Sequence, residues 1–292
     1  MPQTPQPPPP LPRALRLALQ FFVTHGPLGG ARLLASRLFA NLRRQPVERL
    51  ASPLDLYPRQ TPPAIHPFDG LYAVDTSGFR HGEDLGAAPS FTLASAAPFG
   101  PTVWNTAYYG IAPSVFDRAL ALIGSPGPPP AWSGFTFVDL GCGKGRALLL
   151  ASRHPFRHIL GVELDASLVA IAGANLRRFH APWQLCRSLE ALHADATAID
   201  LPLTPILLYL YHPFLAPALR QVLHRLQRSL RHHPRELWLV YINPEAATVL
   251  RDFPFLRPVT RTTLPLDPED ALPDRLGSTQ ERVIIYHVPP PA

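Results

Sequence analysis

A run of alternating glycines lies in the middle of the chain, directly after a short apolar stretch. It spans Asp139–Arg146, D-L-G-C-G-K-G-R, and its glycines are Gly141, Gly143 and Gly145. Because glycine has no side chain, such a loop turns sharply and lets a ligand approach the backbone closely. A helix that starts directly after it presents free N–H groups and a positive dipole end. The run therefore predicts a site for a ligand with a negatively charged group.

Acidic residues end three successive apolar stretches of the second half of the chain. They are Asp139, Glu163 and Asp195. Ligands of parallel sheets bind beyond the carboxyl ends of the strands, so we expect the three carboxylates to face one ligand. A charged acceptor makes strong hydrogen bonds to hydroxyl and amino donors. The alternatives are structural: Asp139 and Glu163 could cap helices or form ion pairs, and Asp195 could start a turn.

The pattern of the glycines argues against a nicotinamide or flavin enzyme. The dinucleotide-binding fingerprint is G-x-G-x-x-G/A, which needs a small residue three positions after its second glycine. Counted from Gly141 and Gly143, that position holds Arg146. An arginine there would crowd the helix against the strand, which disfavours a dehydrogenase.

Proline-free apolar runs and helical stretches alternate after Pro130. Four of the runs fit buried parallel strands, because proline cannot donate to a strand ladder. The expected strands are Thr136–Leu140, His158–Glu163, Ile206–Tyr211 and Glu236–Ile242, with a shorter one at Glu190–Asp195. The expected helices are Arg146–Arg153, Ala166–Phe179 and Ala216–Arg231, preceded by one at Phe116–Ile123. This alternation predicts an α/β fold with a doubly wound, mostly parallel sheet.

Two extended runs close the chain without a long helix between them. They are Leu256–Leu264 and Arg282–Val288, and we expect them to form an antiparallel hairpin at one edge of the sheet.

The segment Asp139–Gly145 resembles motif I of the class I methyltransferases, which use S-adenosylmethionine as cofactor. The resemblance implies that Gly141, Gly143, Gly145 and Asp139 hold the methionine part of S-adenosylmethionine. It also implies that Glu163 binds both ribose hydroxyls and that Asp195 binds the adenine amino group. More narrowly, the loop is similar to those of seven-strand protein lysine methyltransferases. It is closer still to a bacterial group without an assigned substrate, which also carries a segment like Val74–Gly78.

A second motif follows the expected strand Ile206–Tyr211. Amino-methylating relatives carry [N/D]-P-P-[Y/F] here, whereas this chain has His212-Pro213-Phe214. A neutral imidazole retains one acceptor nitrogen, so we expect His212 and Phe214 to be catalytic: His212 to accept a hydrogen bond from the target and Phe214 to pack on it. A plain turn with a surface histidine is the alternative. Tyr108 and Tyr109 could cover the cofactor or lie in the core, and Asn243 could reach the site or cap a helix.

These residues predict methyl transfer from S-adenosylmethionine to a nitrogen on a protein or a small molecule. Two alternatives remain open. The acceptor could be an oxygen or a carbon, or the chain could be a non-catalytic module that binds S-adenosylmethionine and serves regulation or interaction. The altered loop at His212 motivates the second alternative.

The 292 residues divide into three parts by composition. Residues 1–12 are a proline-rich tail that we expect to be disordered, 13–130 a helical and irregular extension, and 131–292 the methyltransferase domain. In the extension, Ala14–Gln20 and Ala31–Leu42 are expected to be short basic helices. Their arginines would form a solvated face; contact with nucleic acid or a membrane surface is the alternative.

The two cysteines limit which compartment and which kinds of site the sequence favours. Cys142 and Cys186 match no metal-binding spacing, so we expect no metal site, and they favour no disulfide framework. No apolar run has transmembrane length. A cytoplasmic protein is therefore expected.

Overall fold

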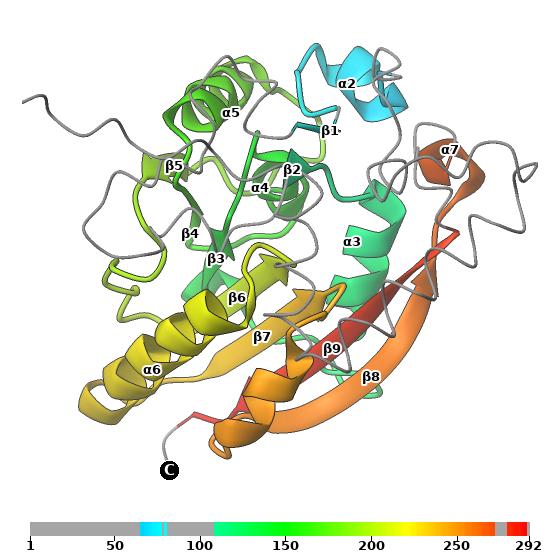
Figure 1. The fold of residues 1–292 in the computed structure, drawn as a ribbon. Helices are drawn as coiled ribbons and strands as arrows, with labels where there is room; N and C mark the ends of the chain where they lie inside the picture. Colours follow the sequence, from blue (N-terminus) through cyan, green and yellow to red (C-terminus); the bar gives the residue numbers. More distant parts are fainter. Residues whose placement is uncertain (1–64, 78, 81–107, 272–278, 291–292) are drawn as a thin grey trace, which may run out of the picture.

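The structure is a computed structural model that describes residues 65–77, 79–80, 108–271 and 279–290 (Figure 1). The predicted tail at 1–12 and the predicted basic helices at Ala14–Gln20 and Ala31–Leu42 lie outside these residues. Within the described ranges, no helix combines the length and the apolar character that crossing a membrane requires.

A seven-stranded sheet forms the centre of the molecule, in the order β5-β4-β3-β6-β7-β9-β8 (Figure 1). The strands are β3 (Thr136–Leu140), β4 (His158–Glu163), β5 (Leu189–His193), β6 (Ile206–Tyr211), β7 (Leu237–Ile242), β8 (Arg257–Pro265) and β9 (Gln280–Val288). The first five run parallel to one another, and β9 is antiparallel to both β7 and β8. The predicted doubly wound sheet with an antiparallel edge hairpin is confirmed.

The order of the strands places a ligand site beside β3. The chain runs outward from β3 to β4 and β5, and then returns to form β6 on the other side of β3. At such a reversal, the loops that leave the carboxyl ends of the strands diverge and open a crevice. The strands that meet there are those that carry Asp139, Glu163 and Tyr211 at or near their carboxyl ends.

Helices cover both faces of the sheet. The helices from residue 113 onward are α3 (Pro113–Ala121), the short η5 (Trp132–Gly134), α4 (Arg146–Ala151), α5 (Ala166–Arg178), α6 (Ala216–His232), η6 (Ala247–Asp252) and α7 (Pro268–Ala271). Along β6, Leu207 and Tyr209 pack with α3 and α4, whereas Leu208 and Leu210 pack with α6 and η6. This alternation is the period of two of a strand buried on both faces.

Small differences from the predicted bounds have local causes. The helix expected at Phe116–Ile123 begins earlier, at Pro113, because proline at the first helical position has no N–H to satisfy. The strand expected to reach Asp195 ends at His193. Asp195 instead opens a turn, in which its Oδ1 accepts hydrogen bonds from the Thr197 N–H and hydroxyl at 2.8 and 2.7 Å.

A short segment before the sheet packs against the domain. It contains α2 (Pro67–Tyr72), which begins after His66, whose Nδ1 accepts a hydrogen bond from the Phe68 N–H at 3.1 Å. The ring of Tyr72 lies 5.1 Å from that of Phe179, at the end of α5. Farther along, β1 (Phe79–Arg80) pairs with β2 (Tyr108–Tyr109) in a two-stranded antiparallel ribbon. Part of the chain before residue 131 therefore belongs to the surroundings of the domain's glycine loop.

Candidate active site

The glycine loop adopts a backbone that only glycine accepts readily. Gly141, Gly143 and Gly145 have φ values of 82°, 53° and 86°, and α4 starts at the next residue. Both the Gly141 and the Cys142 N–H groups donate to the carbonyl of Val162, at 2.7 and 3.1 Å. These bonds tie the loop to β4, so the glycines and the carboxyl end of β4 form one rigid wall.

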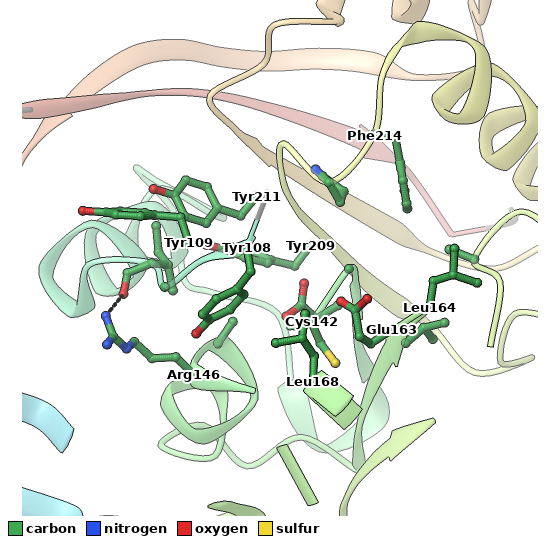
Figure 2. Close-up of a pocket in the computed structure, with 18 of the residues that line it drawn as sticks. Tyr108, Tyr109, Cys142, Arg146, Glu163, Leu164, Leu168, Tyr209, Tyr211 and Phe214 are labelled. Carbon is green, nitrogen blue, oxygen red and sulfur yellow. Dashed lines mark hydrogen bonds between the residues drawn. The ribbon is translucent and has the colours of Figure 1, made fainter. Parts of the chain in front are cut away.

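A pocket opens at the carboxyl ends of β3, β4 and β6 (Figure 2). Seven of the residues singled out from the sequence line it: Tyr108, Tyr109, Asp139, Gly141, Glu163, Asp195 and Phe214. Gly143, Gly145 and His212 are not part of the lining. Figure 2 shows two ends to the pocket, with Glu163 and Leu164 toward one and the rings of Tyr109 and Tyr211 together at the other.

Glu163 is fixed by the backbone around it. Its Oε2 accepts a hydrogen bond from the Gly143 N–H at 2.9 Å, and its Oε1 accepts one from the Asp165 N–H at 2.9 Å. Burial raises the pKa of Glu163, and these backbone hydrogen bonds oppose part of that rise. The carboxylate is therefore held at the strand end in a defined orientation, as an acceptor for two parallel hydroxyl groups requires.

Asp139 also lines the pocket and is more deeply buried than Glu163. Its side chain is only 3 % exposed, and β3 places it opposite Gly161 on one side and Tyr209 on the other. Burial, and secondarily the negative charge of Glu163, raise the pKa of Asp139 well above its usual value. Two neighbouring carboxyls with raised pKa values form a site that a cationic ligand group would stabilise.

Replacing Asp139 by asparagine should stabilise the ligand-free protein while weakening cofactor binding. A folded-state pKa above the unfolded value means that the group's favourable contribution to folding is present below the unfolded pKa and is lost as pH rises through the folded pKa. At neutral pH the ionised Asp139 therefore costs stability. We expect Asp139→Asn to raise the thermal midpoint at pH 7 by a few degrees, since about 1 kcal/mol corresponds to roughly 2–4 °C in a domain of this size.

Thermal unfolding between pH 5 and pH 8 would measure this effect, with Asp200→Asn as the control. Asp200 is fully exposed and pairs with Arg225 at the surface, so its substitution should leave the midpoint in place. If the thermal midpoint of Asp139→Asn at pH 7 does not exceed that of the parent, the buried carboxylate of Asp139 does not destabilise the protein.

Four tyrosines surround the pocket. Tyr108 and Tyr109 come from β2, and Tyr209 and Tyr211 come from β6. The Tyr108 hydroxyl donates to the Thr76 carbonyl at 2.7 Å, and the Tyr211 hydroxyl donates to Glu281 Oε1 at 3.0 Å. The Tyr209 hydroxyl is fully buried and has no hydrogen-bond partner among the described residues. A buried polar atom left unpaired beside a pocket is available for a hydrogen bond to a water or to a polar ligand atom.

The two predicted catalytic residues lie in the loop after β6 but face different surroundings. Phe214 is 6 % exposed and lines the pocket. His212 has a left-handed backbone, with φ at 41°, and its ring stacks on Tyr241, whose hydroxyl lies 3.3 Å from His212 Nδ1. Asn243 likewise has a left-handed backbone and donates its N–H to the Arg282 carbonyl. The structure thus brings Phe214 to the pocket and places His212 beside β7.

The two cations of the glycine loop have partners that the sequence analysis did not identify. Lys144 is 1 % exposed, and its Nζ donates to Asp75 Oδ1 at 2.5 Å and to the Ser77 carbonyl at 2.8 Å. Asn175 of α5 completes the link, since its Nδ2 donates to the carbonyls of Asp75 and Lys144 at 2.8 and 2.9 Å. Lys144 therefore binds the segment at residues 65–77 and not the pocket.

Arg146, two residues after Lys144, also binds this segment. Its Nε donates to Thr76 Oγ1 at 2.6 Å, its Nη2 to the Thr76 carbonyl at 2.9 Å, and its Nη1 to the Ile111 carbonyl at 3.2 Å. Asp69 lies 3.6 Å from the guanidinium and accepts a hydrogen bond from the Thr76 N–H. Arg146 contributes to the lining of the pocket, but its guanidinium N–H groups donate to residues 76 and 111. The only sequence feature that pointed to these contacts was the segment Val74–Gly78, which resembles one in the bacterial group.

Gly143 lets Tyr108 form the roof over the loop. A Cβ at this position would lie 2.1 Å from the Tyr108 ring, and the φ of 53° strains any other residue. We therefore expect Gly143→Ala to cost about 1–3 kcal/mol of stability, as forced overpacking does, and to weaken binding of S-adenosylhomocysteine because the roof is displaced. Gly134→Ala is the matched control, since a Cβ there meets nothing within 4 Å. Urea unfolding and titration calorimetry would compare them; equal values would show that the roof adapts.

Comparisons with known proteins identify the kind of domain. Residues 137–233 match the family model of a methyltransferase domain. A search of curated proteins finds no match to the chain.

Solved structures of methyltransferases are among those that match the fold at low similarity. The N-methyltransferase NodS from Bradyrhizobium japonicum WM9, in complex with S-adenosyl-L-homocysteine, has 12 % identity and a TM-score of 0.41, and the match covers 60 % of this chain and 85 % of that one. An RNA methyltransferase from Salinibacter ruber, also with S-adenosyl-L-homocysteine, has 20 % identity and a TM-score of 0.37, with 61 % and 92 % covered. At these TM-scores the likeness carries no argument about the acceptor.

The residues present fit S-adenosylmethionine. Gly141 brings the backbone of the glycine loop into the lining of the pocket, and the backbone hydrogen bond from Gly143 orients Glu163 at the end of β4. The buried carboxyl groups of Asp139 and Glu163 would stabilise the positive charge of a sulfonium. With the family match and the confirmed sheet, these features show that the chain contains an S-adenosylmethionine-dependent methyltransferase domain.

Proposed function

We propose that the protein transfers the methyl group of S-adenosylmethionine to a nitrogen on a protein or a small molecule. The observation that carries this proposal is the aromatic end of the pocket, which Tyr109, Tyr209 and Tyr211 form apart from the carboxylates proposed to bind S-adenosylmethionine. The loop cations Lys144 and Arg146 bind residues 75–77 and Ile111. Aromatic rings attract an amine, which is cationic in water.

Methyl transfer depends more on the alignment of the acceptor with the methyl group than on general acid–base catalysis. A neutral amine nitrogen attacks the methyl carbon in line, the carbon–sulfur electron pair passes to sulfur, and the resulting ammonium then loses a proton to water. Bound S-adenosylmethionine supplies the activated methyl group. The domain contributes proximity and alignment, which account for a large share of the barrier reduction in such two-reactant steps. Phe214 is proposed to form the wall against which the acceptor packs.

A labelled-methyl transfer assay tests the proposal. The purified protein is incubated with methyl-labelled S-adenosylmethionine and fractionated lysate, and labelled acceptors are identified by mass spectrometry. We expect the label on an amine nitrogen. Label on oxygen or carbon would replace nitrogen as the acceptor atom, and tight cofactor binding without any labelled product would favour the non-catalytic binding module.

The role of His212 stays a prediction, and glycine substitution tests it. Glycine accepts the left-handed backbone at position 212 but has no imidazole. A catalytic His212 predicts that His212→Gly loses turnover while S-adenosylmethionine affinity is unchanged. A residue that serves only the turn and its contact with Tyr241 predicts turnover like that of the parent. Single-turnover rates of the two proteins, with calorimetric cofactor affinities as control, distinguish these outcomes.

A further inference from the structure

Glu281 lies behind the tyrosine end of the pocket. It is the second residue of β9 and is only 6 % exposed. Because β9 runs antiparallel to β7, it begins at the edge of the sheet where β6 and β7 end. This brings Glu281 to Tyr211, the last residue of β6, whose hydroxyl donates to Glu281 Oε1 at 3.0 Å. A residue of the last strand is thereby hydrogen-bonded to a tyrosine that lines the pocket.

This hydrogen bond decides what the Tyr211 hydroxyl can do. A phenol has one hydrogen to donate, and its oxygen can also accept. Since the hydrogen is directed to Glu281, the oxygen is left to accept a hydrogen bond from a group in the pocket. Burial, followed by the nearby charge of Glu281, raises the pKa of Tyr211 well above its usual value, so the phenol stays protonated at neutral pH. Tyr211 therefore acts as an oriented acceptor and not as a base.

A second tyrosine supports a ligand at this place. The Tyr209 hydroxyl lies on the same face of β6, two residues earlier, and is fully buried without a partner among the described residues. The ring of Tyr109 lies 6.4 Å from that of Tyr211 and closes the side of the pocket (Figure 2). The pocket end thus presents an oriented acceptor and an unsatisfied hydroxyl between aromatic rings.

We propose that Tyr211, with its proton held by Glu281, binds the N–H of the amine that receives the methyl group. This inference rests on the proposed function, and it adds the residue that orients the acceptor. When one N–H of a neutral amine donates to the Tyr211 oxygen, the nitrogen lone pair is directed elsewhere and can be aimed at the methyl carbon. Glu281 acts through Tyr211 and is a positioning residue.

Sinefungin provides a probe that does not require the natural acceptor. In this analogue of S-adenosylmethionine, an amine-bearing carbon replaces the methyl-bearing sulfonium, so an ammonium stands where the methyl group would be. S-adenosylhomocysteine has no such group and serves as the reference ligand. The ratio of the two dissociation constants isolates what the protein offers to a nitrogen at the position of the methyl group, which is next to the position of the acceptor nitrogen.

We expect Tyr211→Phe to weaken sinefungin relative to S-adenosylhomocysteine by about tenfold, the loss of one hydrogen bond to a charged group. Glu281→Gln should weaken it several-fold, since the amide can donate to Tyr211 and turn the phenol hydrogen toward the ammonium. In the Tyr211→Phe protein, adding Glu281→Gln should leave the ratio unchanged, because Glu281 acts through the lost hydroxyl. Tyr286→Phe, the same change near the opposite end of β9, is the matched control and should not alter the ratio.

Titration calorimetry on the full-length proteins gives these ratios. An unchanged ratio in Tyr211→Phe, with S-adenosylhomocysteine affinity retained, would overturn the assignment of Tyr211. An effect of Glu281→Gln on the ratio that persists without the Tyr211 hydroxyl would overturn the positioning role of Glu281. Should a variant bind neither ligand, Tyr211→His, which keeps an aromatic ring with a polar atom, replaces it in the same comparison. The labelled-methyl assay is separate: a protein that labels nothing but shows the expected ratios would refute the proposed function and retain the amine site.

Discussion

Arg146→Ala is expected to cost about 3–5 kcal/mol of unfolding free energy, the usual loss when one partner of a buried ion pair is removed. The guanidinium is 4 % exposed, and Asp69, its carboxylate partner, is 3 % exposed. Without Arg146, the Asp69 charge stays buried, the Ile111 carbonyl loses the guanidinium as a donor, and the Thr76 carbonyl keeps the Tyr108 hydroxyl but not the guanidinium. Since most domains are stable by only about 5–15 kcal/mol, a large part of the total would be lost.

Urea unfolding followed by circular dichroism would measure this loss, with Arg220→Ala as the control. Arg220 also pairs with an aspartate, Asp252, but both side chains are about half exposed, and such surface pairs contribute about 0–1 kcal/mol. The double variant Arg146→Met with Asp69→Asn removes both charges and should lose less stability than Arg146→Ala alone. Equal losses for Arg146→Ala and Arg220→Ala would show that the buried network contributes little.

Glu163→Ala should weaken S-adenosylmethionine binding by about 1.5–3 kcal/mol, the range for hydrogen bonds to a charged group. This corresponds to roughly tenfold to a hundredfold or more in the dissociation constant. The expected cause is the loss of the acceptor for the ribose hydroxyls, which the backbone hydrogen bonds from Gly143 and Asp165 hold in place. Titration calorimetry with S-adenosylmethionine measures the change.

A deoxyribose ligand separates lost ligand contacts from a disturbed loop. If Glu163 binds the ribose, its removal should cost less for 2′-deoxy S-adenosylhomocysteine than for S-adenosylhomocysteine, because one hydroxyl is already missing. A merely displaced glycine loop would weaken both ligands equally and remove the ribose assignment. Glu190→Ala is the control, since Glu190 is exposed on β5 and pairs with His158 away from the pocket.

The sheet could be predicted because its signals are local. The runs that form β3, β4 and β6 are apolar and free of proline, and burial on both faces selects such runs. The glycine loop could be predicted for the same reason, since three positive φ values within five residues leave their mark in the sequence directly. The bounds differ from the prediction where side chains intervene, as at Asp195.

The surroundings of the loop could not be predicted, because they depend on contacts between distant parts of the chain. Lys144 and Arg146 bind residues 69 and 70 positions earlier, in a stretch without helical or strand periodicity. A basic pair beside a glycine loop suggests a ligand contact, whereas the structure uses both cations to hold a segment of the chain. The direction of His212 was equally hidden, since it follows from a left-handed backbone that the Tyr211–Phe214 motif does not reveal.

The segment at residues 65–77 is synthesised early, but several of the residues that it contacts are synthesised much later. During synthesis from the amino terminus, Asp75 cannot bond Asn175 until 100 further residues have been added, and His66 waits longer still for Asp270. At about 5–20 residues per second, the first of these intervals lasts on the order of 5–20 seconds. Lys144 itself is 31 residues from Asn175, so the nascent glycine loop lacks its link to α5 for a shorter time, on the order of 2–6 seconds. The ribosome thus makes residues 65–77 before it makes the glycine loop, α5 and α7, which hold that segment in the folded protein.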